Sequence, residues 1–312
     1  MKFISTLFLF AMLSLTGLSQ KKANLSYNLE LNKVYRTKST VVQNTTQTVM
    51  GNEQSVQTNN IMVLSLKPLK KTEEEMITEI RFDTIITLIS QPQMEINSSN
   101  PGNLNSDNPA DIMNTIMHRM SNSAFLVRMN TSGQVLGFMN LDPVVTEILQ
   151  GTDTLQGQTA SFIMQRVGTM LEEKSLRSMI EMQTYYLPGK EMKKDEAWEV
   201  GYNVSGGGIE MSQKADLKLV SLEKNSNLIG GELLIKSLPG TMDMNGVKIT
   251  SDVSGLGKTE MEIDPLTCWI IKGNSQQQLK GELTVNAQGN TFNIPIEINT
   301  DSELTALDVK EE

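Results

Sequence analysis

Residues 108–122 read NPADIMNTIMHRMSN, and they open the one strongly helical block of this chain. Asn108 is a preferred N-cap residue, Pro109 occupies the first helical position, where no backbone donor is lost, and Asp111 places a carboxylate in the first turn. Apolar side chains follow at three- and four-residue spacing: Ile112, Met113, Ile116, Met117 and Met120. This pattern predicts an amphipathic helix from Pro109 to about Asn122.

The same signals recur further along the block. Asp142-Pro143 predicts a short second helix that ends at Gly151, and apolar residues at helical spacing predict a longer run from about Gln158 to Met182. Between the first two helices, the turn sequence of residues 130–133 joins two apolar stretches and predicts a hairpin over 124–140.

Sequence on both sides of the helical block alternates with a period of two. Residues 76–88 place an apolar or threonine side chain at every second position, which is typical of a strand with one face in a core. A strand is also expected at 27–31, and the Asn-, Ser- and Pro-rich residues 92–108 are expected to be a loop. The predicted fold is α+β: a large, curved, half-barrel-like antiparallel sheet with the helical block packed on its concave face.

We expect one β-rich domain over residues 20–312. Its parts are a first β half at 20–97, the helical block with its hairpin at 108–188, and a second β half at 196–300. Asn130 and Asp264 each start a similar turn, three residues before Gly133 and Thr267. The similarity fits a duplication of two related halves, and it fits convergence on a common turn equally well.

The first residues have the composition of a secretory signal peptide. Lys2 precedes an apolar run from Phe3 to Leu18, and small residues at Gly17 and Ser19 offer a cleavage site. An uncleaved anchor helix is the alternative, but the run is shorter than the ~20 apolar residues that a span needs. We expect residues 1–19 to be removed, which leaves an extracytoplasmic chain, periplasmic or secreted, without a stable membrane span.

The charge balance argues against a polyanionic partner. The 312 residues carry 27 basic and 36 acidic side chains, a formal net charge of −9, and the basic residues form no extended stripe. We therefore expect no nucleic acid partner, and binding to anionic headgroups is disfavoured. Hydrophobic residues make up 38% of the chain, which is enough for a substantial core.

Little in the sequence supports catalysis. His118 is the one histidine and Cys268 the one cysteine, whereas a nucleophilic triad needs a base beside its nucleophile. We expect Cys268 to be a buried small hydrophobe, and we expect no catalytic residue, no metal site and no cofactor, so the protein is not predicted to be an enzyme. The metal alternative is a soft Cu(I) site on the first helix. Its ligands would be Met113, Met117, His118 and Met120, but His118 points about 100° away from Met117 on a helix.

Several markers together resemble a known family. They are the signal peptide, the Thr- and Val-rich hairpins, the turn at 130–133, the approach from Pro188-Gly189 to Trp198, and a Gly-x-Gly at 255–257 followed by Ile263-Asp264 and Thr267. In this order they resemble an uncharacterised family of bacterial secreted envelope proteins, over most of the mature chain. Cys268 stands where that resemblance would place a glycine. More loosely, the expected sheet is similar to the half-barrels of periplasmic lipoprotein carriers, which implies a concave apolar surface and no catalytic residues.

Methionine content adds a hint about that surface. The chain has 20 methionines, and methionine is the adaptable residue of cores and of promiscuous apolar grooves. We expect a non-enzymatic envelope protein that binds an apolar ligand, either a lipid or a lipidated partner, between sheet and helices. The alternative is a structural or interaction module without a small-molecule ligand. The candidate lining residues of the groove are Met113, Ile116, Met117, Met120, Phe162, Val167 and Met170.

Overall fold

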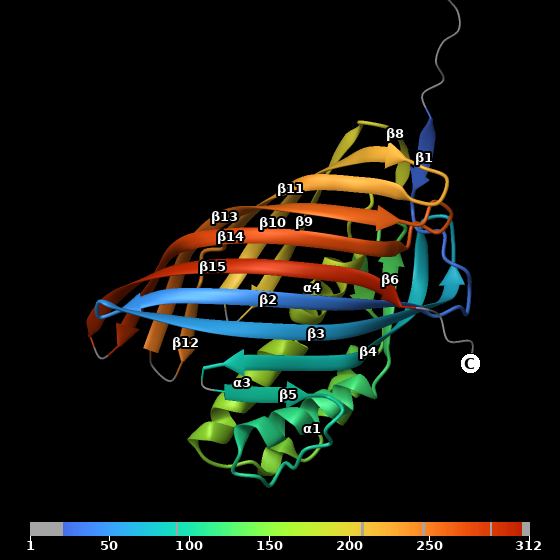
Figure 1. The fold of residues 1–312 in the computed structure, drawn as a ribbon. Helices are drawn as coiled ribbons and strands as arrows, with labels where there is room; N and C mark the ends of the chain where they lie inside the picture. Colours follow the sequence, from blue (N-terminus) through green and yellow to red (C-terminus); the bar gives the residue numbers. More distant parts are fainter. Residues whose placement is uncertain (1–20, 92, 207–208, 245–246, 288, 308–312) are drawn as a thin grey trace, which may run out of the picture.

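A large curved sheet dominates the molecule. The computed structural model describes residues 21–91, 93–206, 209–244, 247–287 and 289–307. The predicted signal peptide lies outside these residues. Within them, thirteen strands form one open, antiparallel sheet that curves around four helices (Figure 1). The fold is therefore α+β, which confirms the sequence prediction.

The elements follow one another in the order strands, helices, strands. The helices are α1 (Pro109–Ser121), α2 (Leu141–Ile148), α3 (Gln158–Leu171) and α4 (Glu173–Thr184), with a short 3-10 helix at Thr152–Thr154. The strands are β1 (Lys22–Leu25), β2 (Tyr35–Val49), β3 (Asn52–Lys71), β4 (Glu75–Ser90), β5 (Gln93–Asn97), β6 (Phe125–Asn130), β7 (Val135–Phe138), β8 (Lys190–Lys193), β9 (Ala197–Gly206), β10 (Ile209–Leu222), β11 (Asn227–Ser237), β12 (Thr241–Met244), β13 (Val247–Ile263), β14 (Ile270–Ala287) and β15 (Asn290–Leu307).

The main sheet has two free edges and a centre built from both ends of the chain. Its order is β7-β6-β4-β3-β2-β15-β14-β13-β11-β10-β9, with β5 added to β4 and β12 added to β13. The first long strand, β2, pairs with the last, β15. Strands β1 and β8 form a separate two-stranded sheet. The free edges are β7 and β9, and α4 contacts both of them.

Glycines allow neighbouring strands to approach closely where the sheet bends. A Cβ atom at Gly281 of β14 would overlap the backbone of Asp252 and Val253 on β13, and one at Gly255 of β13 would overlap the Gln278 carbonyl of β14. A side chain at either position is therefore incompatible with this backbone. Glycine in a strand interior commonly marks such sharp curvature, so these two residues help to set the concave shape.

The helix boundaries follow local signals. Asn108 Oδ1 accepts a hydrogen bond from the Ala110 N–H at 3.1 Å, which confirms the predicted cap of α1. Helix α2 begins at Leu141, two residues earlier than expected, so Pro143 lies within the first turn, where backbone N–H groups have no helical acceptor in any case. The third predicted run is divided into α3 and α4 at Glu172, whose backbone is extended.

The expectation of an unbroken loop at 92–108 is wrong. Residues 93–97 form β5, in which Met94 pairs with Ile89 and Ile96 with Thr87 of β4. The surrounding Asn and Ser residues obscure this short alternation in the sequence. Strand β5 in turn supports α1, which packs against it.

The expected strand at 27–31 is also absent from the described fold. The Tyr27 N–H donates to the Thr131 carbonyl at 2.8 Å, and the Asn28 N–H donates to the Thr267 carbonyl at 3.1 Å. Apolar and polar side chains do alternate in this segment, but its backbone N–H groups donate to two turns rather than to a neighbouring strand. The segment thus joins the two similar hairpin turns of the chain.

These two turns begin in the same way but differ in length by one residue, because the Asn130 N–H donates to the Gln134 carbonyl whereas the Asp264 N–H donates to the Trp269 carbonyl. Asn130 and Asp264 each accept a hydrogen bond from the backbone N–H two residues further on, at 3.1 Å and 3.0 Å. A residue with positive φ then returns the chain, and it is Gly133 (92°) in the first turn and Cys268 (58°) in the second. Cys268 therefore adopts the left-handed conformation that glycine usually provides.

Candidate functional site

The seven predicted groove residues lie on two contacting helices, α1 and α3. Four of them are buried in the core: Ile116, Met117, Met120 and Val167. Two are partly buried against it: Met113 and Met170. Phe162 is half-buried, with the Arg166 guanidinium 5.6 Å from its ring centre. The structure thus brings these residues near one another, and contact with a ligand stays a prediction.

The concave face of the sheet is a second candidate surface. Directly paired residues on antiparallel strands share one face, so the buried residues Val253, Leu279 and Ile296 identify the concave side of β13, β14 and β15. Across the described strands β13, β14, β15 and β2, no charged residue occupies a concave position. Every Lys, Arg, Asp and Glu of these strands faces the convex side.

Uncharged polar side chains cross this face in two adjacent rows, which we call the belt. One row contains Thr259, Ser275, Ser302 and Asn60, with the apolar Val41 of β2 between the last two, and the other contains Gln277, Thr300, Gln43 and Thr58. All eight are half-buried. The Ser275 Oγ atom is buried without a hydrogen-bond partner, and within the described part of the chain Gln277 and Thr300 make no side-chain hydrogen bond. Some polar groups of the belt therefore have no partner in the described part of the chain, whereas Thr259, Asn60 and Gln43 hydrogen-bond within the protein.

Apolar side chains occupy the same face at the strand tips, and we call them the rim. The rim consists of Ile249, Leu283, Val285, Phe292 and Ile294. Phe292 is 43% exposed, and of these five residues Leu283 alone packs against the described core. Figure 1 shows the tips of β14 and β15 projecting past the helices. The rim is thus an apolar surface that the helices leave uncovered.

Side chains of α4 take the place of a strand at the sheet edges. Glu181 Oε1 accepts a hydrogen bond from the Val135 N–H of β7 at 2.9 Å, and the Arg177 guanidinium donates to the Val135 carbonyl. On the other edge, the Ser178 hydroxyl donates to the Asn203 carbonyl of β9. Burial raises the pKa of Glu181, although the Val135 N–H and the Arg177 charge oppose this shift. Helix α4 therefore bridges β7 and β9.

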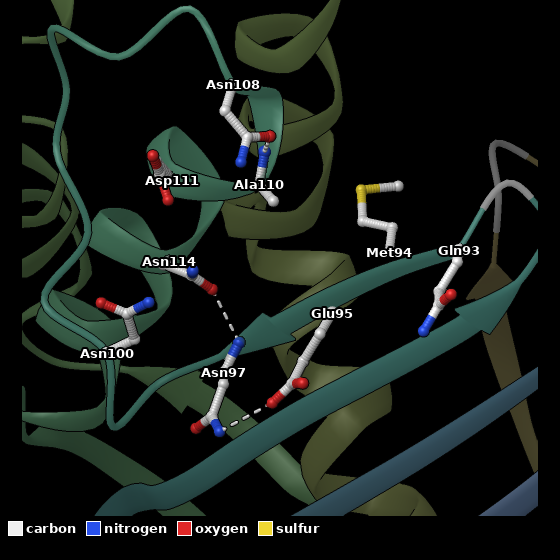
Figure 2. Close-up of a pocket in the computed structure, with 9 residues that line it drawn as sticks. All are labelled: Gln93, Met94, Glu95, Asn97, Asn100, Asn108, Ala110, Asp111 and Asn114. Atoms are coloured by element: carbon white, nitrogen blue, oxygen red, sulfur yellow. Dashed lines mark hydrogen bonds between the residues drawn. The ribbon is translucent and has the colours of Figure 1, made fainter.

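A polar pocket of about 400 Å³ lies between β5 and the start of α1 (Figure 2). The Asn97 N–H donates to Asn114 Oδ1 at 2.7 Å, and the Asn97 amide donates to Glu95 Oε1 at 3.2 Å. Asn108 caps α1, and Asn100 Oδ1 accepts the Gly102 N–H at 3.0 Å. These groups hold the loop and helix in place, so the pocket has a structural explanation.

The two residues considered for catalysis are both engaged in structural contacts. His118 Nδ1 lies 2.9 Å from the Ser98 carbonyl oxygen. The Cys268 thiol donates to the Asn24 carbonyl at 3.3 Å, and burial raises its pKa to about 11. The thiol is therefore protonated at neutral pH, as expected for a buried small hydrophobe.

No group of three or more His, Cys, Asp or Glu side chains in the described part of the chain is arranged to hold a metal ion. None of the described helices combines the length and the apolar character that crossing a membrane requires.

The belt and the rim were not predicted from the sequence, although the placement of charged residues along β15 gives part of the pattern. In residues 290–306 the acidic residues Glu297, Asp301 and Glu303 all occupy odd positions, and the even positions are uncharged. This alternation indicates that one face avoids charge. Which residues of neighbouring strands lie side by side depends on register, however, and a single strand does not specify it.

Comparisons with known proteins add a family. The model of DUF6263, a family of unknown function, matches residues 73–270. No curated protein matches the chain. Among solved structures, lipovitellin, studied for its lipid–protein interactions, aligns at 9% identity and a TM-score of 0.43 over 90% of this chain and 26% of its own. The COG4313 outer membrane channel of Pseudomonas putida F1 aligns at 6% identity and a TM-score of 0.24 over 90% of this chain and 98% of its own. OpdQ of Pseudomonas aeruginosa aligns at 8% identity and a TM-score of 0.23 over 88% and 99%. At these TM-scores none of the three carries an argument about function.

Proposed function

The chain belongs to the DUF6263 family of unknown function, and we propose that it is a non-enzymatic, extracytoplasmic binding protein. It holds an apolar ligand, either a lipid or the lipid chain of a lipidated partner, against the concave face of its sheet. The observation that carries this proposal is the rim, whose five apolar side chains share one face and lie almost entirely outside the core.

An apolar surface of this kind favours a ligand on energetic grounds. Complete burial of one large apolar side chain contributes roughly 1.5–3 kcal/mol, and contiguous exposed apolar patches on soluble proteins commonly mark binding surfaces. On the convex side, by contrast, Leu256 is 67% exposed on a face that carries Lys258 and Glu260. The rim differs from this convex surface because the rows of paired residues that contain it carry no charged side chain.

Export is part of the proposal and is supported by the sequence of residues 1–19. Lys2 and the apolar run that follows it have the organisation of a signal peptide. Intact mass and N-terminal sequencing of the protein from its native host test this step. A mature chain that begins at Gln20 in the extracytoplasmic fraction is expected, and a cytosolic chain that begins at Met1 would contradict export.

Ligand binding is tested by native mass spectrometry of gently purified protein, together with a fluorescent hydrophobic dye. We expect retained lipid and dye binding, both reduced at least about tenfold in Phe292→Asp, because a carboxylate in the rim opposes apolar contact. Leu256→Asp is the matched control on the convex face and is expected to bind as the wild type does.

The alternative is a structural or interaction module without a small-molecule ligand. The burial of Ile116, Met117 and Met120 favours this alternative, because these side chains pack in the core. A clean apo mass with no dye binding by the wild type would support this alternative over the proposal.

A further inference from the structure

The polar pocket between β5 and α1 contains a buried side chain whose hydrogen-bonding capacity is half used. Asn114 lines this pocket and is only 5% exposed, and its Oδ1 accepts the Asn97 N–H at 2.7 Å (Figure 2). This bond fixes the orientation of the amide, so Nδ2 is the free end. Within the described part of the chain, Nδ2 donates to no acceptor. Native proteins rarely leave a buried donor unpaired, so the pocket suits a ligand that offers a carbonyl oxygen.

Two carboxylates line the same pocket without a counter-ion. In the described residues Glu95 accepts one hydrogen bond, from the Asn97 amide, and Asp111 accepts one at its side chain, from the Ser106 hydroxyl. Neither carboxylate has a Lys or Arg partner there, and no basic side chain lines the pocket. Residues 82–117 contain four acidic residues and no Lys or Arg. The pocket therefore complements a cationic group.

Strand β5 also presents an unpaired edge to the pocket. It has five residues and pairs with β4 alone. The Asn97 N–H points away from β4, and outward-facing backbone groups alternate along an antiparallel strand, so the N–H and C=O of Glu95 face the same side.

The two outward-facing positions of this edge differ in what covers them. At Asn97, the Asn114 amide takes the place of a further strand. At Glu95, no group of the described chain takes that place. An extended peptide that pairs with such an edge gains backbone hydrogen bonds, and side-chain pockets beside the edge give specificity.

We propose that this pocket docks an extended peptide segment of a partner protein, and that the segment carries a lysine or arginine side chain. The peptide pairs with the outer edge of β5, one of its carbonyls accepts Asn114 Nδ2, and its cation is held by the carboxylates of Glu95 and Asp111. A small amine would neutralise the carboxylates but would leave the strand edge unpaired. This surface is separated from the rim by β4, β3 and β2, and the inference goes beyond the proposed function without depending on it.

Two pentapeptides, matched in length to β5, test the charge. They are acetyl-Ser-Val-Lys-Val-Ser-amide and the same peptide with norleucine, which keeps the four side-chain carbons of lysine without the ammonium group. In titration calorimetry with the intact, gently purified protein at low salt, the lysine peptide is expected to bind at least about tenfold more tightly. Acetyl-lysine-amide has the cation but no extended backbone, and it is expected to bind at least about tenfold more weakly than the lysine peptide.

An exposed glutamate on each of two strands supplies matched variants. Glu95→Gln removes the charge and keeps an oxygen that can accept the Asn97 amide, so the affinity for the lysine peptide should fall about threefold to fivefold. Its affinity for the norleucine peptide should not change. Glu53→Gln is the control, because Glu53 is also exposed but lies on β3 outside the pocket. This control is expected to bind both peptides as the wild type does.

Hydrogen exchange measured by NMR tests the strand pairing. At saturation with the lysine peptide, the Glu95 amide proton should exchange at least about fivefold more slowly, because it gains an acceptor. The Asn97 amide proton already has an acceptor in Asn114, so its exchange rate is the internal reference and should change little.

Each contrary outcome overturns a definite part of the proposal. Equal binding of the lysine and norleucine peptides overturns the cationic side chain, and unchanged binding of the lysine peptide to Glu95→Gln overturns its position. Unchanged exchange at Glu95, or binding of acetyl-lysine-amide as tight as that of the pentapeptide, overturns the strand pairing. Binding of neither pentapeptide at millimolar concentration overturns the docking site. None of these results bears on dye or lipid binding at the rim, which the Phe292→Asp variant tests separately.

Discussion

Apolar side chains alternate along the strands at both ends of the concave face. One end, which we call the covered end, lies under the helices, and the other, which we call the open end, does not. At the covered end, Phe82 and Phe125 are fully buried with their ring centres 5.8 Å apart. At the open end, Phe292 continues the apolar alternation of β15, yet it remains 43% exposed. The difference shows that alternation in a strand assigns a residue to a face, whereas burial depends on whether a helix covers that part of the face.

Replacing one phenylalanine at each end gives the largest expected effect. Phe125→Ala removes a ring that also lies 6.3 Å from the Phe138 ring, and it should lower the free energy of unfolding by about 3–5 kcal/mol. Phe292→Ala should lower it by less than about 1 kcal/mol, because the ring leaves little cavity behind. Urea unfolding of both variants measures the difference. Equal losses would show that the open end is covered in solution.

A glycine pair tests what gives the face its curvature. Gly281→Ala places a Cβ against the backbone of Asp252 and Val253, so we expect a loss of about 1–3 kcal/mol from overpacking. Gly201→Ala, on edge strand β9, meets the Gln213 carbonyl oxygen at an ordinary 3.8 Å and should change stability by less than about 0.5 kcal/mol. Thermal unfolding with calorimetry compares the two. A neutral Gly281→Ala variant would mean that the bend does not require close strand approach.

The smallest expected effect concerns the α4 bridge at the covered end. Glu181 has a pKa raised above its ordinary value of 4.5 in the folded state, so the folded protein holds this proton more tightly than the unfolded chain. The resulting stabilisation is complete below the unfolded pKa and is lost as pH rises through the folded pKa. Glu181→Gln keeps an acceptor for the Val135 N–H but does not titrate.

Stability curves of the wild type and Glu181→Gln between about pH 4 and pH 8 measure this contribution. The wild type should gain stability relative to the variant as the pH falls towards about 4. Parallel curves would mean that solvent reaches Glu181 and that α4 holds the edge strands less tightly than the structure indicates.

Much of the fold could be predicted from the sequence because its signals are local. The Asn108 cap, the apolar stripe of α1 and the strand over residues 76–88 each follow from a few neighbouring positions, and all three elements are confirmed. The predicted core face of that strand holds only from Met76 to Phe82, because a register shift against β3 then moves the alternation to the other face, where Leu88 is 37% exposed. Residues 27–31 also alternate, yet they form no strand, since alternation does not reveal whether a partner strand is available. The local pattern therefore fails where the outcome depends on distant residues.

The candidate site could not be predicted for the same reason. The belt and the rim exist because residues such as Gln277 and Thr300 are paired across strands, and that register follows from the turn geometry and the whole set of strands. The predicted groove residues were chosen from helix periodicity alone. Periodicity places Met117 and Met120 correctly on an apolar stripe, but it does not separate a core position from a ligand contact.

The pairing of β2 with β15 has a consequence for the nascent chain. Arg36 lies opposite Leu307 in this ladder, and the Asn28 N–H binds the Thr267 carbonyl. Strand β2 must therefore wait until β15 has been made before the centre of the sheet can form. Folding dominated by such long sequence separations is slow. The centre of this sheet therefore closes late in folding, after strands that are neighbours in the sequence have had time to pair.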